Sequence, residues 1–247
     1  MSNQATIRFV ILAAPRSGSN MLCSMLNSHH SILCHHELYN PADIFYALQL
    51  RDSDFKLAVN MEQRDRQPLS FLARVWRYNQ SKSCVGFKMT HKQNPQVFDA
   101  LLADTSIKKI VLKRNNTVKV HVSKLIAEQN GIWEDYGQHA PTKHNQVEVD
   151  LSSLQADVAF NLAFYQEIII SLNQSKQNYI VVEYEKLTTQ LTQNTILDFL
   201  KLQHQALTTM SCKQNSTDLR QLVSNFSTLF EQCQDKSLKA QLTDRCS

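Results

Sequence analysis

The sequence has few residues that interrupt helices and strands, and it has no long apolar run. Of its 247 residues, only 4 are glycine and 5 are proline, which excludes collagen-like and linker-rich architectures. The longest apolar run near the N-terminus, FVILAA from Phe9 to Ala14, covers six residues. A membrane span needs roughly 20, and a signal-peptide core roughly 7–15. We therefore expect a cytoplasmic protein without a membrane span.

The cysteines are spaced too widely to indicate a metal site or a redox motif. No CxxC occurs, and no Cys/His pair has zinc-ligand spacing. These spacings favour a reduced intracellular protein that holds no metal ion. The six cysteines are Cys23, Cys34, Cys84, Cys212, Cys233 and Cys246.

The chain does contain enough apolar material for one core. Hydrophobic residues make up 43% and charged residues 19%, which argues against disorder across the whole chain. The length favours a single domain over residues 1–247, with an elaborated lid. A net charge of +4 is too small to indicate nucleic-acid binding, but it fits a protein with one anion-binding pocket.

Four short β-rich segments alternate with segments of helical periodicity, which predicts an α/β fold. The segments are Ile7–Ala13, Cys84–Lys88, Ile107–Leu112 and Tyr179–Glu183. Strands alternating with helices indicate βαβ units, and hence a three-layer αβα arrangement with a central parallel sheet. In such folds the ligand lies beyond the carboxyl ends of the strands.

The clearest helix is predicted from Leu151 to Leu172, with Asp150 as its N-cap. Further helices are predicted from Leu69, Leu72 and Trp76, from Phe98, Leu101 and Leu102, from Val118, Val122, Leu125 and Ile126, and from Leu219, Leu222, Phe226 and Leu229. The buried face of the long helix is expected to carry Leu151, Leu154, Val158, Leu162, Tyr165, Ile169 and Leu172. Trp133–Asn145 lacks periodicity, so we expect a lid or acceptor loop around residues 131–150.

The first predicted strand runs into a turn suited to a phosphate-like group. The turn reads PRSGSN (residues 15–20), and a helix is predicted to follow it. A glycine-containing turn at a helix N-terminus directs N–H groups to one point, where the helix dipole is positive. Arg16 adds a permanent cation, and Ser17 and Ser19 add hydroxyl donors. The Walker A pattern G-x-x-x-x-G-K-[ST] is absent; by itself, this turn could also be an ordinary serine-rich connection.

A second cationic site is predicted after the strand Ile107–Leu112. Lys113 and Arg114 follow this strand, where a typical nucleotidase would place a metal-holding Asp. Ser123 lies about two turns into the next helix. A guanidinium can bind a phosphate bidentately, although a surface ion pair is the simpler interpretation of this motif alone. The two sites together predict a ligand with phosphates at both ends of a nucleoside.

Several motifs follow one another along the chain: FVILAAPRSGSNML (residues 9–22), CHHELYNP (34–41), VGFKM (85–89) and IVLKRNNTVKVHVSKLIAEQNGIW (110–133), with the less distinctive VVEYEKL (181–187) and KQN (213–215) after them. In this order, the motifs resemble those of PAPS-dependent sulfotransferases, specifically bacterial carbohydrate and nodulation-factor sulfotransferases. PAPS is 3′-phosphoadenosine 5′-phosphosulfate. The resemblance spans roughly residues 7–226, and the last two motifs are its weaker matches.

The resemblance implies transfer of a sulfonate group from PAPS to a hydroxyl or amine of a small-molecule or glycan acceptor. The product would be adenosine 3′,5′-bisphosphate, with no metal and no nucleic-acid partner; a homodimer is compatible with this subgroup. The donor-binding residues that it implies are Arg16, Ser17, Gly18, Ser19, Asn20, Met21, Arg114, Ser123 and Lys213.

The resemblance also implies the catalytic residues. Glu37 matches the carboxylate that acts as the base, and His36 and His35 are the alternatives, because an imidazole is a ready general base. Arg16 would stabilise the leaving oxygen, and Lys88 would bind the sulfonate or the acceptor. The chain departs from the pattern at His36, where the family usually has glycine, and at Ser123, which lies one residue beyond the usual position.

Two other functions remain open at this point. The first is a small nucleotide kinase-like phosphotransferase built on the same turn, which would depend on a metal ion. The second is a nucleotide-binding protein without catalytic activity.

Overall fold

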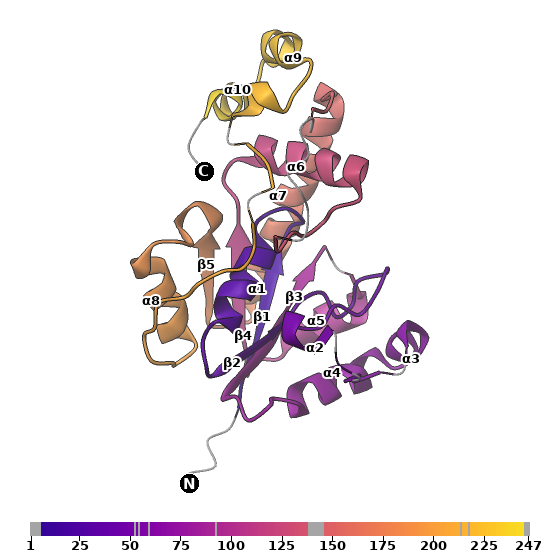
Figure 1. The fold of residues 1–247 in the computed structure, drawn as a ribbon, viewed down its shortest axis with the longest axis vertical. Coiled ribbons are helices and arrows are strands. Elements are labelled where there is room, and N and C mark those ends of the chain that lie inside the picture. Colours follow the sequence, from indigo (N-terminus) through magenta and orange to yellow (C-terminus); the bar gives the residue numbers. More distant parts are fainter. Residues whose placement is uncertain are drawn as a thin grey trace.

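The structure is a computed structural model that describes residues 6–51, 53, 55–58, 60–91, 93–137, 146–212, 214–216 and 218–244. Within these ranges five parallel strands form one sheet in the order β2-β3-β1-β4-β5, as Figure 1 shows. The strands are β1 (Ile7–Ala13), β2 (Ile32–His35), β3 (Cys84–Thr90), β4 (Ile107–Lys113) and β5 (Tyr179–Glu183). The predicted α/β class is confirmed, and β2 is a strand that the sequence pattern did not predict.

Helices connect and cover these strands. They are α1 (Ser19–Asn27), α2 (Leu48–Arg51), α3 (Met61–Arg66), α4 (Pro68–Arg77), α5 (Pro95–Ala103), α6 (Thr117–Asn130), α7 (Leu151–Gln174), α8 (Gln190–Phe199), α9 (Phe226–Gln232) and α10 (Lys236–Thr243), with short 3₁₀ helices at Tyr184–Lys186 and Leu219–Gln221.

The central strand β1 separates two apolar cores. Its residues Phe9 and Ile11 pack with α1 and α8 on one face of the sheet. Val10 and Leu12 pack with α4, α5 and α7 on the other. All four side chains are fully buried, as expected for a parallel strand covered on both faces. The result is the three-layer arrangement that the sequence predicts.

A third apolar cluster joins the C-terminal helices to the body of the protein. Val118 and Val122 of α6 pack against Leu222, Leu229 and residues of α10, and α9 and α10 lie above α6 in Figure 1. Val122 faces this cluster, and the next residue, Ser123, is rotated away from it by about 100° around the axis of α6.

Two helix predictions need correction. The long helix α7 does begin after Asp150, whose side chain accepts a hydrogen bond from the Ser153 amide at 2.8 Å. However, Leu162 is 52% exposed, because Phe164, Tyr165 and Ile168 face the sheet instead. The single helix predicted through Leu219, Leu222, Phe226 and Leu229 is also wrong. It is interrupted because the backbone around Val223 bonds to that of Val147.

Two further features concern membrane spans and cysteines. Across the described part of the chain, no helix is both long enough and apolar enough to cross a membrane. The cysteines at positions 23, 34, 84, 212 and 233 are free thiols, and Cys246 lies outside the described residues.

Candidate active site

A cavity of about 1070 Å³ opens at the carboxyl ends of the strands. It is lined by residues that follow all five strands, which is where a parallel α/β sheet places its ligand. Of the residues predicted from the sequence, the lining includes Arg16, Gly18, Ser19, Asn20, Met21, His36, Glu37, Lys88, Arg114 and Ser123. Lys213 lies outside the described residues.

The turn after β1 has the backbone geometry that its glycine allows. Arg16 and Gly18 both adopt positive φ, at 63° and 87°, and α1 begins directly after Gly18. The first N–H groups of a helix have no intrahelical acceptor. Residues 18–21 line the cavity, so this helix end presents a positive pole to it.

Gly18 is also required by close packing. A Cβ at this position would lie 2.1 Å from Cδ2 of Tyr184. The Arg114 guanidinium also lies over the Tyr184 ring, 4.7 Å from the ring centroid. We expect Gly18→Ala to lower the free energy of unfolding by about 2–4 kcal/mol, because overpacking adds to the cost of a positive φ.

Gly131→Ala is the matched control for this prediction. Gly131 also has positive φ, at 69°, but a Cβ there would meet nothing within 4 Å. The free energy of unfolding should therefore fall only by the ~1–2 kcal/mol that a residue with a Cβ loses at positive φ. Urea denaturation measures the free energy of unfolding of both variants. Equal decreases would show that overpacking against Tyr184 does not affect stability.

The two predicted arginines lie at the same end of the cavity. The Arg16 Nε donates to Ser123 Oγ at 2.9 Å, its Nη1 donates to the Trp133 carbonyl at 2.5 Å, and its Nη2 donates to Gln214 Oε1. Arg114 Nη1 lies 3.4 Å from the Arg16 carbonyl oxygen. The sequence predicted two separate cationic sites. In the structure the Arg16 side chain instead extends to Ser123, so the two sites meet in one cationic cluster of Arg16, Arg114 and Ser123.

This cluster is electrostatically suited to an anion. Neither Arg16 nor Arg114 has a carboxylate within 4 Å among the described residues. Burial, and then repulsion from Arg114, lower the pKa of Arg16 to about 10, and burial lowers the pKa of Arg114 as well. Both groups stay charged at neutral pH. An anion would relieve their desolvation and mutual repulsion together.

Among the described residues predicted to bind the donor, Ser17 does not line the cavity. It is fully buried, and both its hydroxyl (2.6 Å) and its amide (3.3 Å) donate to the Ala14 carbonyl. The predicted role of its hydroxyl as a hydrogen-bond donor to a phosphate is therefore wrong. The tight turn consumes both of its donors, so Ser17 shapes the turn instead.

A second polar cluster surrounds Glu37, which also lines the cavity. Lys88 Nζ lies 2.8 Å from Glu37 Oε1. The amides of Asn40 and Gln93 both donate to Glu37 Oε2 at 2.6 Å. Lys88 also donates to Asn20 of the turn after β1, which links this cluster to the cationic one.

These contacts determine the charge of Glu37. Burial alone would raise the pKa of its carboxyl, but the Lys88 ammonium and the three hydrogen bonds lower that pKa below its usual value. Glu37 is therefore ionised at neutral pH and able to accept a proton. Its side chain is 18% exposed, so an acceptor in the cavity can reach it.

The two neighbouring histidines differ in position. The His35 Nδ1 accepts a hydrogen bond from the Ala47 amide at 3.2 Å, and His35 is fully buried and absent from the cavity lining; it is a structural residue and not an alternative base. His36 does line the cavity, with Nδ1 3.3 Å from Asn20 Oδ1. Burial and the charge of Lys88 lower its pKa well below the usual value, so its imidazole is neutral.

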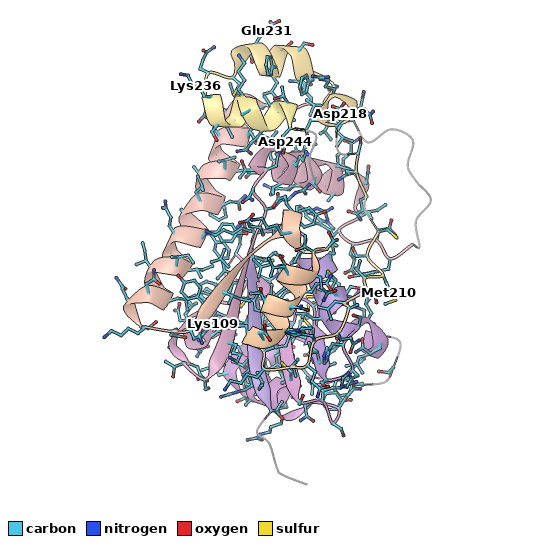
Figure 2. The ribbon with its side chains drawn as sticks, turned by 90° about the vertical axis from the view of Figure 1, so that its left-hand side faces the viewer. Lys109, Met210, Asp218, Glu231, Lys236 and Asp244 are labelled. Atoms are coloured by element: carbon cyan, nitrogen blue, oxygen red, sulfur yellow. The ribbon has the colours of Figure 1, made fainter. Side chains whose placement is uncertain are left out.

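The segment predicted as a lid contributes its described part to the cavity. Residues 131–135 line it, and the Trp133 carbonyl accepts from both Arg16 and Asn20. The Cys212 amide donates to the Asp135 carbonyl at 2.9 Å, which ties this segment to the one that carries Gln214. In Figure 2, Met210 lies below Asp218, and Asp218 lies close to the C-terminal helices. Residues 138–145 lie outside the described part.

The structure also brings residues to the cavity that the sequence had not singled out. Lys119 is buried and lines it one turn before Ser123, and that spacing of four is the signal that could have identified it. Gln214 and Asn215 contact Arg16 and Ser123. In the described ranges no three His, Cys, Asp or Glu side chains are grouped for a metal ion.

Comparison with known proteins gives relatives over most of the chain, although no family model matches it. The chain is 30% identical over 187 residues to nodulation protein H of Rhizobium tropici, covering 72% of this chain and 68% of that protein. It is 26% identical over 225 residues to nodulation protein H of Rhizobium meliloti strain 1021, covering 88% and 87%. Among solved structures, a sulfotransferase from Alicyclobacillus acidocaldarius aligns at 14% identity and a TM-score of 0.45, over 95% of both chains.

Proposed function

The chain is a sulfotransferase of the PAPS-dependent family, and on that premise we propose that it transfers a sulfonate group from PAPS to a hydroxyl or amine of a small-molecule or glycan acceptor. The observation that carries the donor assignment is the cationic cluster. Two largely buried guanidinium groups, neither of them within 4 Å of a carboxylate among the described residues, lie beside the helix N-terminus of the turn after β1. A donor that carries anionic groups on both the 3′ and the 5′ positions of its ribose matches this concentration of positive charge.

In this proposal each part of the cavity binds one part of the donor. Arg114 and Ser123 hold the 3′-phosphate; Lys213, which lies outside the described residues, is assigned to the same phosphate by the family resemblance. The first-turn amides of α1 and Arg16 hold the 5′-phosphosulfate. Arg16 can serve there because its contacts in the structure are all neutral oxygens, and a charged phosphosulfate competes well with neutral acceptors.

The chemistry requires a proton acceptor and charge stabilisation. When bound, PAPS supplies an activated sulfonate. Glu37 removes the proton of the acceptor hydroxyl as its oxygen forms a bond to sulfur, and the bond from sulfur to the 5′-phosphate oxygen breaks. Arg16 and the α1 amides stabilise the charge that develops on that leaving oxygen, and a single donor of this kind typically lowers the barrier by ~3–4 kcal/mol. Lys88 neutralises the sulfonate oxygens.

The pairing of Lys88 with Glu37 gives a pH prediction. A carboxylate base loses activity as the pH falls through its pKa, so the acid limb of kcat/KM should lie below the usual carboxyl value in the wild type. Lys88→Met removes the charge that lowers the pKa of Glu37, and burial then raises that pKa. We expect the acid limb to move to higher pH, besides any loss of rate.

The control for this shift is Lys124→Met. Lys124 pairs with Asp157 at 2.9 Å and does not touch Glu37, so its removal should leave the acid limb in place. A pH profile that is the same in Lys88→Met and in the wild type would contradict the assignment of Glu37 as the base.

Acceptor-dependent formation of adenosine 3′,5′-bisphosphate from PAPS tests the function directly. The protein is incubated with PAPS and a set of mono- and oligosaccharides and polar hydroxylated compounds, and both products are identified by mass spectrometry. Sulfated acceptor should appear in equal amount with the bisphosphate. Phosphate transfer from Mg-ATP without any sulfonate transfer would support the kinase-like alternative instead.

A further inference from the structure

The ends of β1 and β4 are joined by a side chain from α7. The hydroxyl of Tyr165 accepts a hydrogen bond from the Ala14 amide at 2.9 Å and donates one to the Leu112 carbonyl at 2.7 Å. Ala14 directly precedes the turn that carries Arg16. Leu112 is followed by Lys113 and then by Arg114. The phenol therefore connects the starting points of the two chain segments that form the cationic cluster.

This hydroxyl takes the place of a backbone hydrogen bond. The last paired residues of β1 and β4 are Ala13 and Leu112. The next bond of a parallel ladder would join the Ala14 N–H to the Leu112 carbonyl. Both groups bond to Tyr165 instead, so the phenol continues the connection between the two strands beyond their last paired residues. Without the phenol, a buried donor and a buried acceptor would lose their partner.

Other contacts of Tyr165 also involve the two segments. Its ring lies 5.1 Å below the Lys113 ammonium, and the Ser17 hydroxyl is within hydrogen-bonding reach of its phenol. Burial raises the pKa of Tyr165, which keeps the phenol protonated and able to donate. One buried side chain thus touches both the turn after β1 and the end of β4.

We propose that Tyr165 is a positioning residue that fixes the distance between the Arg16 turn and the Arg114 segment, and so matches the cavity to a donor with anionic groups at both ends. The proposal rests on the function proposed above. Arg16 and Arg114 repel each other, so the two segments need a fixed connection in the absence of an anion. Tyr165 supplies it while leaving both guanidinium groups directed to the cavity.

The test compares two ligands in two variants. Adenosine 3′,5′-bisphosphate should contact both segments, whereas adenosine 5′-monophosphate lacks the 3′-phosphate. Tyr165→Phe keeps the ring and removes only the hydroxyl. We expect the dissociation constant of the bisphosphate to rise about tenfold, as for the loss of one or two hydrogen bonds, and that of the monophosphate to rise less than about twofold.

Tyr46→Phe is the matched control. Tyr46 is equally buried, and its hydroxyl also accepts from a backbone amide, that of Leu57 at 3.0 Å. This variant should lower the melting temperature similarly but leave the dissociation constants of both ligands unchanged. Equal losses for the two ligands in Tyr165→Phe, or no loss, would overturn the positioning role. Failure of the wild type to bind the bisphosphate would contradict the proposed function itself.

A measurement on the wild type covers the case in which Tyr165→Phe does not fold. The Ala14 amide proton should exchange with solvent as slowly as the amides of β1, because it bonds to the buried phenol. Exchange of this proton at the rate of an exposed loop amide would overturn the proposal.

Discussion

Arg114→Ala should raise the dissociation constant for adenosine 3′,5′-bisphosphate by at least about 100-fold. Removing one partner of a buried, hydrogen-bonded charge pair typically costs 2–5 kcal/mol, and the proposed 3′-phosphate would lose its guanidinium. The remaining cation, Arg16, would also lose a neighbour whose charge adds to the attraction. Isothermal titration calorimetry measures the change.

Arg220→Ala is a suitable control for the loss of one positive charge. Arg220 is exposed and lies over the ring of Phe226, outside the cavity lining, so its removal should leave the bisphosphate affinity unchanged. If Arg114→Ala bound the bisphosphate as tightly as the wild type, the donor site would have to lie elsewhere.

Glu37→Gln should have the largest effect on turnover. A positioned general base typically contributes 10²–10⁴-fold to the rate. We therefore expect kcat to fall by at least about tenfold, and by about 10²–10⁴-fold if the full contribution of the base is lost. A glutamine has nearly the same shape and can still accept from Lys88 through its carbonyl oxygen, but it cannot take a proton. Binding of the bisphosphate should therefore be retained, which separates the chemical step from donor binding.

The alternative base, His36, provides the reciprocal experiment. Burial and Lys88 lower its pKa, and it contacts Asn20 of the turn, so His36→Gln should reduce turnover much less than Glu37→Gln. Unchanged turnover in Glu37→Gln together with a large loss in His36→Gln would transfer the role of base to the imidazole.

Much of the fold follows from local sequence. The strands β1, β3, β4 and β5 could be predicted because each is a continuous β-rich run between periodic helical segments. The strand β2 could not, because it has only four residues and its edge position depends on pairing with β3. Likewise, the interruption before α9 results from a bridge between Val147 and Val223, a contact that no local pattern contains.

The candidate site, too, could be predicted from the sequence only in part. Sequence order was sufficient to place Arg16, Lys88 and Arg114 at the carboxyl ends of the predicted strands, because connectivity in a parallel sheet determines that edge. Glu37 was identified through the family resemblance instead, since the strand β2 before it was not predicted. The directions of the side chains required the tertiary structure. Arg16 extends to Ser123 because segments 131–135 and 214–215 provide its remaining acceptors. The hydroxyl of Ser17 is used within its own turn.

The central claim is that the cationic cluster holds an adenosine donor with phosphate groups at both ends. It is tested most directly by titrating the wild-type protein with adenosine 3′,5′-bisphosphate in the absence of magnesium. We predict binding at micromolar or lower concentration. Absence of binding to the bisphosphate, combined with tight magnesium-dependent binding of ATP, would contradict the claim.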